Sequence, residues 1–187
     1  MQKIVFVGAP GSGKSTLAAQ IFTALKIRGH NTELVDEFIR RDLQMHGAMT
    51  SIWEQYRTRC RQEEIEDAVP EMVEYLVADS GTISPYFYAV HYADPTDKRQ
   101  RLVLQDMHRY LIDDLYLRRY DHIFYLPVFW TEDKQDGTRF QTDDEIKTLD
   151  EHMKMIFTKL FRSCSVHHVD VPYADRFDEV MRIIDNQ

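Results

Sequence analysis

Residues 8–16 read Gly8-Ala9-Pro10-Gly11-Ser12-Gly13-Lys14-Ser15-Thr16 and match the pattern G-x-x-x-x-G-K-[ST] at every fixed position. An apolar run, residues 3–7, precedes the motif, and residues 15–28 behind it carry apolar side chains at helical spacing. Glycines let backbone N–H groups converge on phosphate oxygens, and the start of a helix adds partial positive charge. The stretch therefore predicts a phosphate loop, set between a strand and a helix, that binds ATP.

Two polar side chains of this loop have predicted roles in binding ATP and its metal ion. We expect Lys14 to reach the β- and γ-phosphates and the Ser15 hydroxyl to complete the shell of a Mg²⁺ ion. The alternative interpretation is a glycine-rich turn that carries a lysine by chance. It does not explain why a predicted strand precedes the motif and a predicted helix follows it. ATP and Mg²⁺ are therefore the predicted cofactors.

The rest of the chain alternates apolar runs with longer amphipathic segments. The runs are short, as in strands buried on both faces, and occur at residues 3–7, 32–36, 75–79, 122–126 and 166–170. The segments with helical periodicity lie at about 15–28, 50–68, 101–119, 142–160 and 174–184. This alternation predicts a single α/β domain, residues 1–187, with a parallel sheet and helical crossovers.

Several local features refine this prediction. Thr142 with Glu145 matches a capping box at the start of a helix. Two long loops are expected at residues 81–98 and 127–141, and loops of such length are usually functional or mobile. The helix at 50–68 is expected to anchor itself through Ile52, Trp53, Tyr56 and Ile65. Its arginines 57, 59 and 61 fan over different faces and are interpreted as surface charge.

Carboxylates follow two further strand-like runs. Asp36 and Glu37 follow the second run, and Asp79 ends the third. Ligands of an open parallel sheet bind at the carboxyl ends of its strands. Transfer to a hydroxyl needs one carboxylate to accept the proton and another to hold Mg²⁺. We predict Glu37 as the base, with Asp36 as a close alternative, and Asp79 as the metal ligand, although Asp36 and Glu37 also suit a helix cap. Ser80 follows Asp79 where a hydrolytic ATPase usually has a glutamate, which argues against a mechanical ATPase.

Cationic and aromatic residues complete the predicted site. Arg40 and Arg41 are candidates for binding an anionic group of the acceptor, with solvated surface charge as the alternative. The polar segment 127–141 resembles a lid, from which Arg139 would fold over the γ-phosphate. Tyr86, in an aromatic run, is a candidate for stacking on a planar ring, although such runs more often pack in a core.

Composition limits the classes of partner. The 187 residues carry 23 Lys and Arg against 31 Asp and Glu, a net charge of −8 with a pI near 5.4. This balance disfavours duplex nucleic acid and anionic membranes, without excluding a locally basic cleft. The two cysteines, Cys60 and Cys164, provide neither a disulfide framework nor a zinc site. The apolar run among the first residues breaks at Gly8 and is too short for a signal peptide or a membrane span. A soluble, cytoplasmic protein is therefore expected.

Taken together, these motifs resemble P-loop kinases of the nucleoside and nucleotide kinase superfamily, nearest to the AAA-like kinases of the nicotinamide riboside kinase type. The likeness rests on the phosphate loop, Glu37 with Arg40, the acidic end of the third strand, and Asp136-Gly137 with Arg139. It implies a three-layer α/β/α fold of the P-loop NTPase type, with a five-stranded parallel sheet and the phosphate-loop strand in its centre. Glu37 and Arg40 would face the acceptor, and Arg139 would come from a short lid.

The sequence departs from these kinases after Asp79, where many of them have arginine and this chain has Ser80. Arg118 or Arg119 could supply the missing cation, or simply end a helix. The favoured expectation is a kinase that phosphorylates a hydroxyl of a small nucleoside-like or nucleotide-like acceptor. A nucleoside monophosphate kinase, a kinase of a nucleic acid base or terminus, and an NTP-binding switch without transfer remain as alternatives. Both a monomer and a homodimer fit the sequence.

Overall fold

The computed structural model describes residues 1–38, 51–117, 119–129, 141–160 and 166–186. A five-stranded parallel sheet has the order β2-β3-β1-β4-β5, which confirms the predicted sheet with the phosphate-loop strand in its centre. The strands are β1 (Gln2–Val7), β2 (Thr32–Val35), β3 (Tyr75–Asp79), β4 (His122–Tyr125) and β5 (Val166–His168). Each coincides with one of the five apolar runs.

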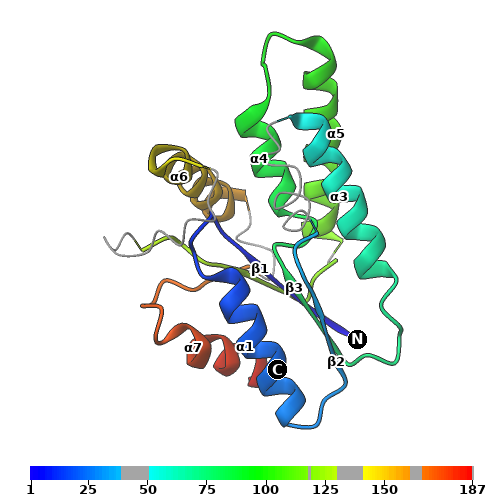
Figure 1. Ribbon diagram of the computed structural model, residues 1–187, viewed down its shortest axis with the longest axis vertical. Coiled ribbons are helices and arrows are strands. Elements are labelled where there is room, and N and C mark those ends of the chain that lie inside the picture. Colours follow the sequence, from blue (N-terminus) through cyan, green and yellow to red (C-terminus); the bar gives the residue numbers. More distant parts are fainter. Residues whose placement is uncertain (39–50, 118, 130–140, 161–165, 187) are drawn as a thin grey trace.

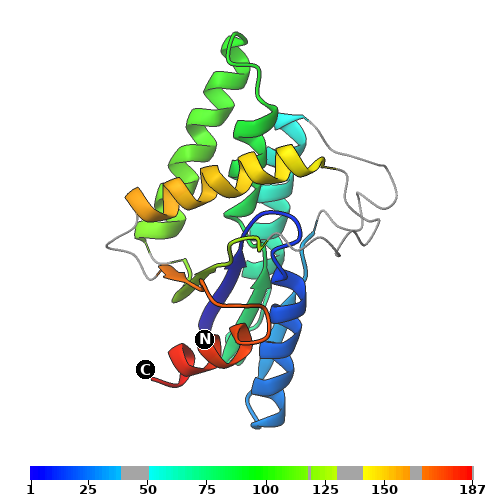
Figure 2. The same ribbon diagram turned by 90° about the vertical axis from the view of Figure 1, so that its left-hand side faces the viewer.

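Helices cover both faces of the sheet (Figures 1 and 2). They are α1 (Lys14–Ile27), α3 (Ile52–Asp67), α4 (Ser84–Tyr92), α5 (Lys98–Tyr116), α6 (Asp143–Leu160) and α7 (Arg176–Asp185). On one face, Ile4 and Phe6 of β1 pack in a core with α1 and α7. On the other, Val5 and Val7 pack in a core with α4, α5 and α6. The alternation of side chains along β1 thus builds the three layers.

The sheet register brings the carboxyl ends of β1, β2 and β3 to one edge. Phe6 pairs with Asp79, and Val35 pairs with Ala78. The loops that leave these strands therefore lie side by side, where a ligand of a parallel sheet binds. In the described ranges, no helix is long and apolar enough to cross a membrane.

The prediction of a long loop at residues 81–98 was wrong, because the segment contains helix α4. Pro85 occupies the first turn of α4, where its missing N–H costs no helical hydrogen bond. Phe87 and Ala89 of the aromatic run are fully buried. Core packing thus stabilises a helix that local composition did not suggest.

The expected packing of α3 was also partly wrong. Ile52 is buried as predicted, but Trp53 is 51% exposed and Ile65 is 40% exposed. The face of α3 that packs inward is instead mostly polar and carries Gln55, Thr58, Arg59, Gln62 and Glu66. Arg59, interpreted as surface charge, is 3% exposed and forms ion pairs with Glu63 at 2.9 Å and Asp114 at 3.3 Å. Partners on α3 and α5 satisfy its charge, so burial is tolerated.

The predicted capping box of α6 is confirmed. The Thr142 backbone N–H donates to Glu145 Oε2 at 2.7 Å, and the Glu145 N–H donates to Thr142 Oγ1 at 3.3 Å. A second box begins α3, where the Ser51 side chain accepts from the Glu54 N–H at 3.3 Å. These caps satisfy backbone donors that a helix start leaves without partners.

Strands β4 and β5 meet through two histidines. His122 Nδ1 lies 3.2 Å from His167 Nε2, and the His167 ring stacks on Phe124 with centroids 5.1 Å apart. Burial lowers the pKa of His167, and His122 adds to the decrease. Protonating His167 in the folded protein is therefore unfavourable.

This pair predicts a specific loss of stability in acid. A folded-state pKa below the unfolded value of 6.5 stabilises the fold above that pH, and the contribution is lost as pH falls through the folded-state pKa. We expect His167→Phe, which keeps a ring on Phe124, to lose less unfolding free energy than wild type between pH 7.5 and 5. Urea denaturation at each pH measures this difference, and parallel pH profiles would contradict it.

Candidate active site

The loop between β1 and α1 has the backbone geometry of a phosphate loop. Gly11 and Gly13 have φ angles of 82° and 84°, which favour glycine over residues with a Cβ. The Ser12 N–H donates to the Ala9 carbonyl at 3.2 Å, and Lys14 Nζ donates to the same oxygen at 3.1 Å. Lys14 is only 8% exposed. The loop thus folds over its own lysine at the start of α1.

Gly8 and Ser12 show that this loop is a cradle without room for larger side chains. A Cβ on Gly8 would lie 2.4 Å from the Leu126 carbonyl oxygen and 2.6 Å from Ser12 Oγ. The buried Ser12 Oγ has no hydrogen-bond partner among the described residues. A narrow loop with a lysine and a hydroxyl at its centre suits a chain of phosphates.

Two of the predicted carboxylates lie near one another at the neighbouring strand ends. Asp79 is 4% exposed at the end of β3, and Glu37 is half-buried two residues after β2. Burial raises the pKa of Tyr88 well above its usual value, and the charges of Glu37 and Asp79 both add to this rise. Tyr88 on α4 therefore lies within electrostatic range of both carboxylates, which lie at or just after the ends of neighbouring strands of the sheet. Asp36, the alternative base, is exposed.

The structure places Tyr86 on a different side of α4 from Tyr88. Its hydroxyl lies 3.1 Å from Nδ1 of His108 on α5, and its ring packs edge-on against Phe87. Tyr88, which belongs to the same aromatic run, lies within electrostatic range of the carboxylates instead. Tyr92, one turn later, accepts a hydrogen bond from Gln141 at 3.2 Å. Recognising 84–92 as a helix would have separated Tyr86 from the other two tyrosines.

Residues 3–176 match the model of the AAA_28 family, described as an AAA domain. The chain belongs to this family of AAA domains. A search of curated protein sequences found no match. The family match confirms the AAA-like part of the resemblance drawn from the sequence, and the solved structures confirm the fold that it implied.

Solved structures share the fold of this AAA domain. NadR in complex with NR has a TM-score of 0.77 and 18% identity over 99% of this chain, which spans 51% of NadR. Thymidylate kinase from Candida albicans has a TM-score of 0.66 and 16% identity, covering 99% of this chain and 91% of that one. Deoxyadenosine kinase from M. mycoides with bound dATP has a TM-score of 0.61 and 16% identity, covering 99% and 100%. The AAA domain thus spans about half the length of NadR.

Several predicted cations of the AAA domain fall outside the described residues: Arg40, Arg41, Arg118 and Arg139, the last with most of the predicted lid. Arg119 is described and lies before β4. It pairs with Glu66 at 3.3 Å and Asp67 at 3.0 Å, near the end of α3. These contacts engage Arg119 with carboxylates of the protein itself, so it is a poor replacement for an acceptor-binding arginine.

A buried chain of hydrogen bonds connects the segments that follow β2 and β3. The Phe38 N–H donates to Gln62 Oε1 at 3.0 Å, and Gln62 Nε2 donates to Glu66 Oε1 at 3.2 Å. The Tyr120 hydroxyl donates to Glu66 Oε2 at 2.8 Å and accepts from the Thr82 N–H at 2.9 Å. Phe38 and Thr82 each lie three residues after the end of a strand, β2 and β3 respectively, and close in sequence to the candidate carboxylates Glu37 and Asp79. Helix α3 therefore holds both segments in place.

The turn after β3 depends on a glycine. Ser80 and Gly81 have positive φ angles of 68° and 54°, and a Cβ on Gly81 would lie 2.6 Å from Val5 Cγ2 and 2.7 Å from the Tyr120 hydroxyl. We expect Gly81→Ala to lower the free energy of unfolding by about 2–4 kcal/mol, because overpacking adds to backbone strain. Gly29→Ala is the matched control, since Gly29 has a φ of 91° and an added Cβ would meet nothing within 4 Å. Equal losses in urea denaturation would contradict the steric reason.

Asp150 on α6 is a further residue near the phosphate loop that the sequence patterns did not reveal. It accepts hydrogen bonds from the Tyr125 hydroxyl at 2.9 Å and the Val128 N–H at 3.3 Å. Burial raises the pKa of Asp150, and the charges of Lys154 and Lys14 oppose this rise. Helix α6 thus supplies a carboxylate within electrostatic range of Lys14, attached to the end of β4.

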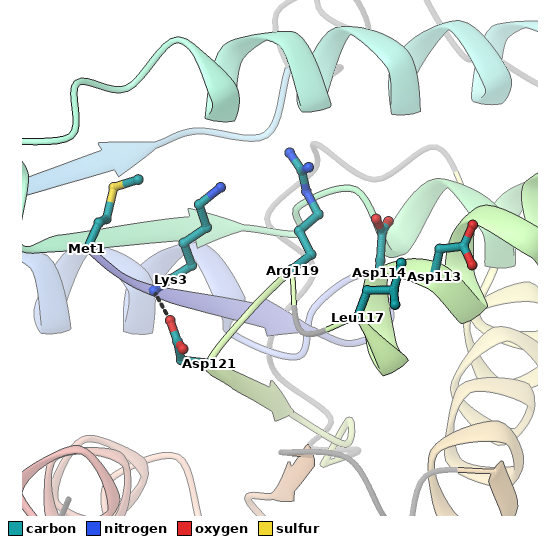
Figure 3. A pocket seen from close by; sticks show the side chains of 7 residues that line it. All are labelled: Met1, Lys3, Asp113, Asp114, Leu117, Arg119 and Asp121. Atoms are coloured by element: carbon teal, nitrogen blue, oxygen red, sulfur yellow. Dashed lines mark hydrogen bonds between the residues drawn. The ribbon is translucent and has the colours of Figure 1, made fainter.

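A shallow pocket of about 460 Å³ lies away from this site (Figure 3). It is lined by Met1, Lys3, Asp113, Asp114, Leu117, Arg119 and Asp121. Met1 and Asp121 immediately precede β1 and β4, so the pocket lies at the amino ends of these strands, whereas the phosphate loop leaves the carboxyl end of β1. The Lys3 N–H donates to Asp121 at 2.7 Å. The pocket is therefore separate from the candidate active site.

Proposed function

We propose that this AAA domain is an ATP- and Mg²⁺-dependent kinase that transfers the γ-phosphoryl group to a hydroxyl of a nucleoside-like or nucleotide-like acceptor. One observation carries the proposal. The phosphate loop with buried Lys14 shares its edge of the sheet with the carboxylates Glu37 and Asp79, on neighbouring strand ends. A cation for phosphates beside a pair of carboxylates is what phosphoryl transfer to a hydroxyl requires.

The residues present fit ATP with Mg²⁺. The backbone at Gly8 packs too closely on Leu126 and Ser12 to accept a side chain, and the Lys14 ammonium lies within the same loop, 3.1 Å from the Ala9 carbonyl oxygen. The described residues contain no group of three His, Cys, Asp or Glu that could hold a metal ion. Mg²⁺ commonly needs only one or two protein ligands when phosphates supply the others, and Ser15 and Asp79 are those we assign. When bound, the ion neutralises charge on the phosphates.

Glu37 is our candidate for the base. Its half-buried carboxylate interacts with Tyr88 beside Asp79, whereas Asp36 is exposed. A base must lie within hydrogen-bond reach of the acceptor hydroxyl, which favours the residue that faces the site. Glu37 would take the proton as the hydroxyl attacks the γ-phosphorus and ADP leaves. Arg40 and Arg41 would bind an anionic group of the acceptor, and Arg139 would cover the γ-phosphate.

The structural neighbours support a small acceptor of this class. They include a NadR complex with NR and a deoxyadenosine kinase with bound dATP. The neighbour from Candida albicans is a thymidylate kinase, which supports a nucleoside monophosphate kinase as the second candidate. We expect the enzyme to act in the cytoplasm, as a monomer or homodimer, on a small molecule in preference to a nucleic acid.

The test is a transfer assay with a broad panel of acceptors. The protein is incubated with γ-labelled ATP, Mg²⁺ and nucleosides, nucleoside monophosphates, nicotinamide riboside or single-stranded DNA. Label on a nucleoside supports the first candidate, label on a monophosphate the second, and salt-sensitive labelling of DNA the nucleic-acid alternative. If ATP binds and label appears only as free phosphate throughout, the chain is an NTP-binding protein and the kinase proposal fails.

A further inference from the structure

A buried arginine lies directly behind the phosphate loop. Arg176, the first residue of α7, is 2% exposed. Its guanidinium donates to the carbonyl of Ser12, to that of Pro127 at 2.6 Å and to that of Val171 at 3.2 Å. These carbonyls belong to the segments that follow β1, β4 and β5. One side chain thus joins the segments that follow β4 and β5 to the phosphate loop that follows β1.

Two aromatic rings hold this guanidinium in place. Its central carbon lies 4.4 Å from the ring centre of Tyr173 and 5.0 Å from that of Phe129. Tyr173 itself contacts the loop, since its hydroxyl donates to the Gly11 carbonyl at 2.9 Å. Two consecutive carbonyls of the loop therefore accept hydrogen bonds from residues 173–176, a segment to which the sequence patterns assign no role.

Burial of this cation is unfavourable in itself. Desolvation lowers the pKa of Arg176, although the nearby Tyr173 and Asp170 oppose the decrease. The hydrogen bonds described for Arg176 go to carbonyl oxygens, which carry no full negative charge. If this position only had to fill space, a hydrophobic residue would do so at a lower cost in folding free energy than a buried arginine. The arrangement indicates that the N–H groups of Arg176 fix the conformation of the backbone segments whose carbonyls they contact.

The contact with Ser12 fixes a peptide plane of the loop. A trans peptide directs its C=O and N–H in opposite directions, so holding the Ser12 carbonyl turns the Gly13 N–H away from Arg176. Gly13 has a φ of 84° and no side chain to restrain it. Without the arginine, this peptide could rotate at small cost. The Gly13 N–H would then no longer point toward a ligand.

We propose that Arg176 is a positioning residue of the phosphate loop, which presents the Gly13 N–H to the β-phosphate of a bound nucleotide. The proposal rests on the nucleotide binding proposed above. It extends the site to the segment between β5 and α7, behind the loop. Because Arg176 acts through the peptide, its effect falls on recognition of the β-phosphate and leaves the rest of the nucleotide unaffected.

The test compares ADP with AMP, which lacks the β-phosphate. Each nucleotide displaces a fluorescent ATP analogue in the presence of Mg²⁺, so that a single site is measured in wild type and in Arg176→Gln. We expect the variant to bind ADP about ten- to hundredfold more weakly and AMP within twofold of wild type, because a hydrogen bond to a charged group is lost from the loop. A general loss of structure would weaken both nucleotides alike.

Further variants serve as controls for the binding measurement on Arg176→Gln. Arg182→Gln, on the same helix, removes an exposed arginine that pairs with Glu179 at 2.7 Å, and should leave the ratio of ADP to AMP affinity unchanged. Tyr173→Phe removes only the hydroxyl that donates to Gly11, and should lower the ratio less than Arg176→Gln does. If Arg176→Gln does not fold, Arg176→Lys decides, because a single ammonium cannot serve the carbonyls of Ser12, Pro127 and Val171 together, and a ratio equal to that of wild type then overturns the proposal.

The binding measurements distinguish failure of the role proposed for Arg176 from failure of the proposed kinase function. A folded Arg176→Gln protein with the wild-type ratio of ADP to AMP affinity overturns the role of Arg176 and leaves the kinase intact. A wild-type protein that binds no adenine nucleotide overturns the proposed function and this role together.

Discussion

Lys14→Met will abolish phosphoryl transfer, lowering the rate by at least about a thousandfold while the protein remains folded. Lys14 is buried in the phosphate loop, where its ammonium group donates to the Ala9 carbonyl. When phosphates enter, the ammonium can turn to the developing charge, and methionine retains the length of the side chain without the charge. The measurement is the rate of labelled product formation at saturating ATP, together with the thermal midpoint of unfolding.

Lys26→Met is the matched control for this prediction. Lys26 lies on the same helix α1, exposed, with its ammonium 5.5 Å from the ring centre of Phe22. We expect its transfer rate to stay within about twofold of wild type, because surface substitutions rarely affect a distant site. A Lys14→Met protein that is folded and retains a tenth of the wild-type rate would remove Lys14 from the reaction.

Glu37→Gln and Asp79→Asn will each lower turnover on the order of a hundredfold or more. Glu37 is assigned the acceptor proton and Asp79 the Mg²⁺ ion, so the two variants should fail in different ways. We expect Asp79→Asn to require a higher Mg²⁺ concentration for half-maximal rate. Glu37→Gln should keep the Mg²⁺ requirement of wild type. Initial rates over a range of Mg²⁺ concentrations separate the two roles.

Asp36→Asn and Glu33→Gln serve as controls for the carboxylates. Asp36 and Glu33 are both exposed, the first just after β2 and the second within it. Glu33→Gln should match wild type. If Asp36→Asn lowers turnover more than Glu37→Gln does, Asp36 is the base and Glu37 is not. If Asp79→Asn lowers turnover less than tenfold, Asp79 is not the metal ligand.

Features that depend on local sequence were predictable. The phosphate loop, the five buried strands and the Thr142–Glu145 box were all identified correctly, because each is encoded within about ten consecutive residues. Parallel strands buried on both faces give apolar runs that composition alone reveals. The position of β1 in the centre of the sheet followed from the family resemblance, not from these patterns.

Features that depend on distant partners were not predictable. Arg176 looks like an ordinary charged residue at the start of a helix, and only the fold brings the carbonyls of Ser12, Pro127 and Val171 to it. Likewise, nothing near Arg59 in the chain shows that Asp114 will face it. Helical periodicity located α3, but it did not identify the buried face of this helix, because that face is mostly polar.

The polar inner face of α3 also restricts how this protein can change. Moving α3 by one turn would separate Gln62 from the Phe38 N–H and Glu66 from Tyr120, and each orphaned buried group would cost about 1–3 kcal/mol. An apolar face would slide at much lower cost, because one aliphatic contact can replace another. In a deep mutational scan, we therefore expect these hydrophilic positions to be as intolerant as the hydrophobic core, and to accept replacement only in compensating pairs.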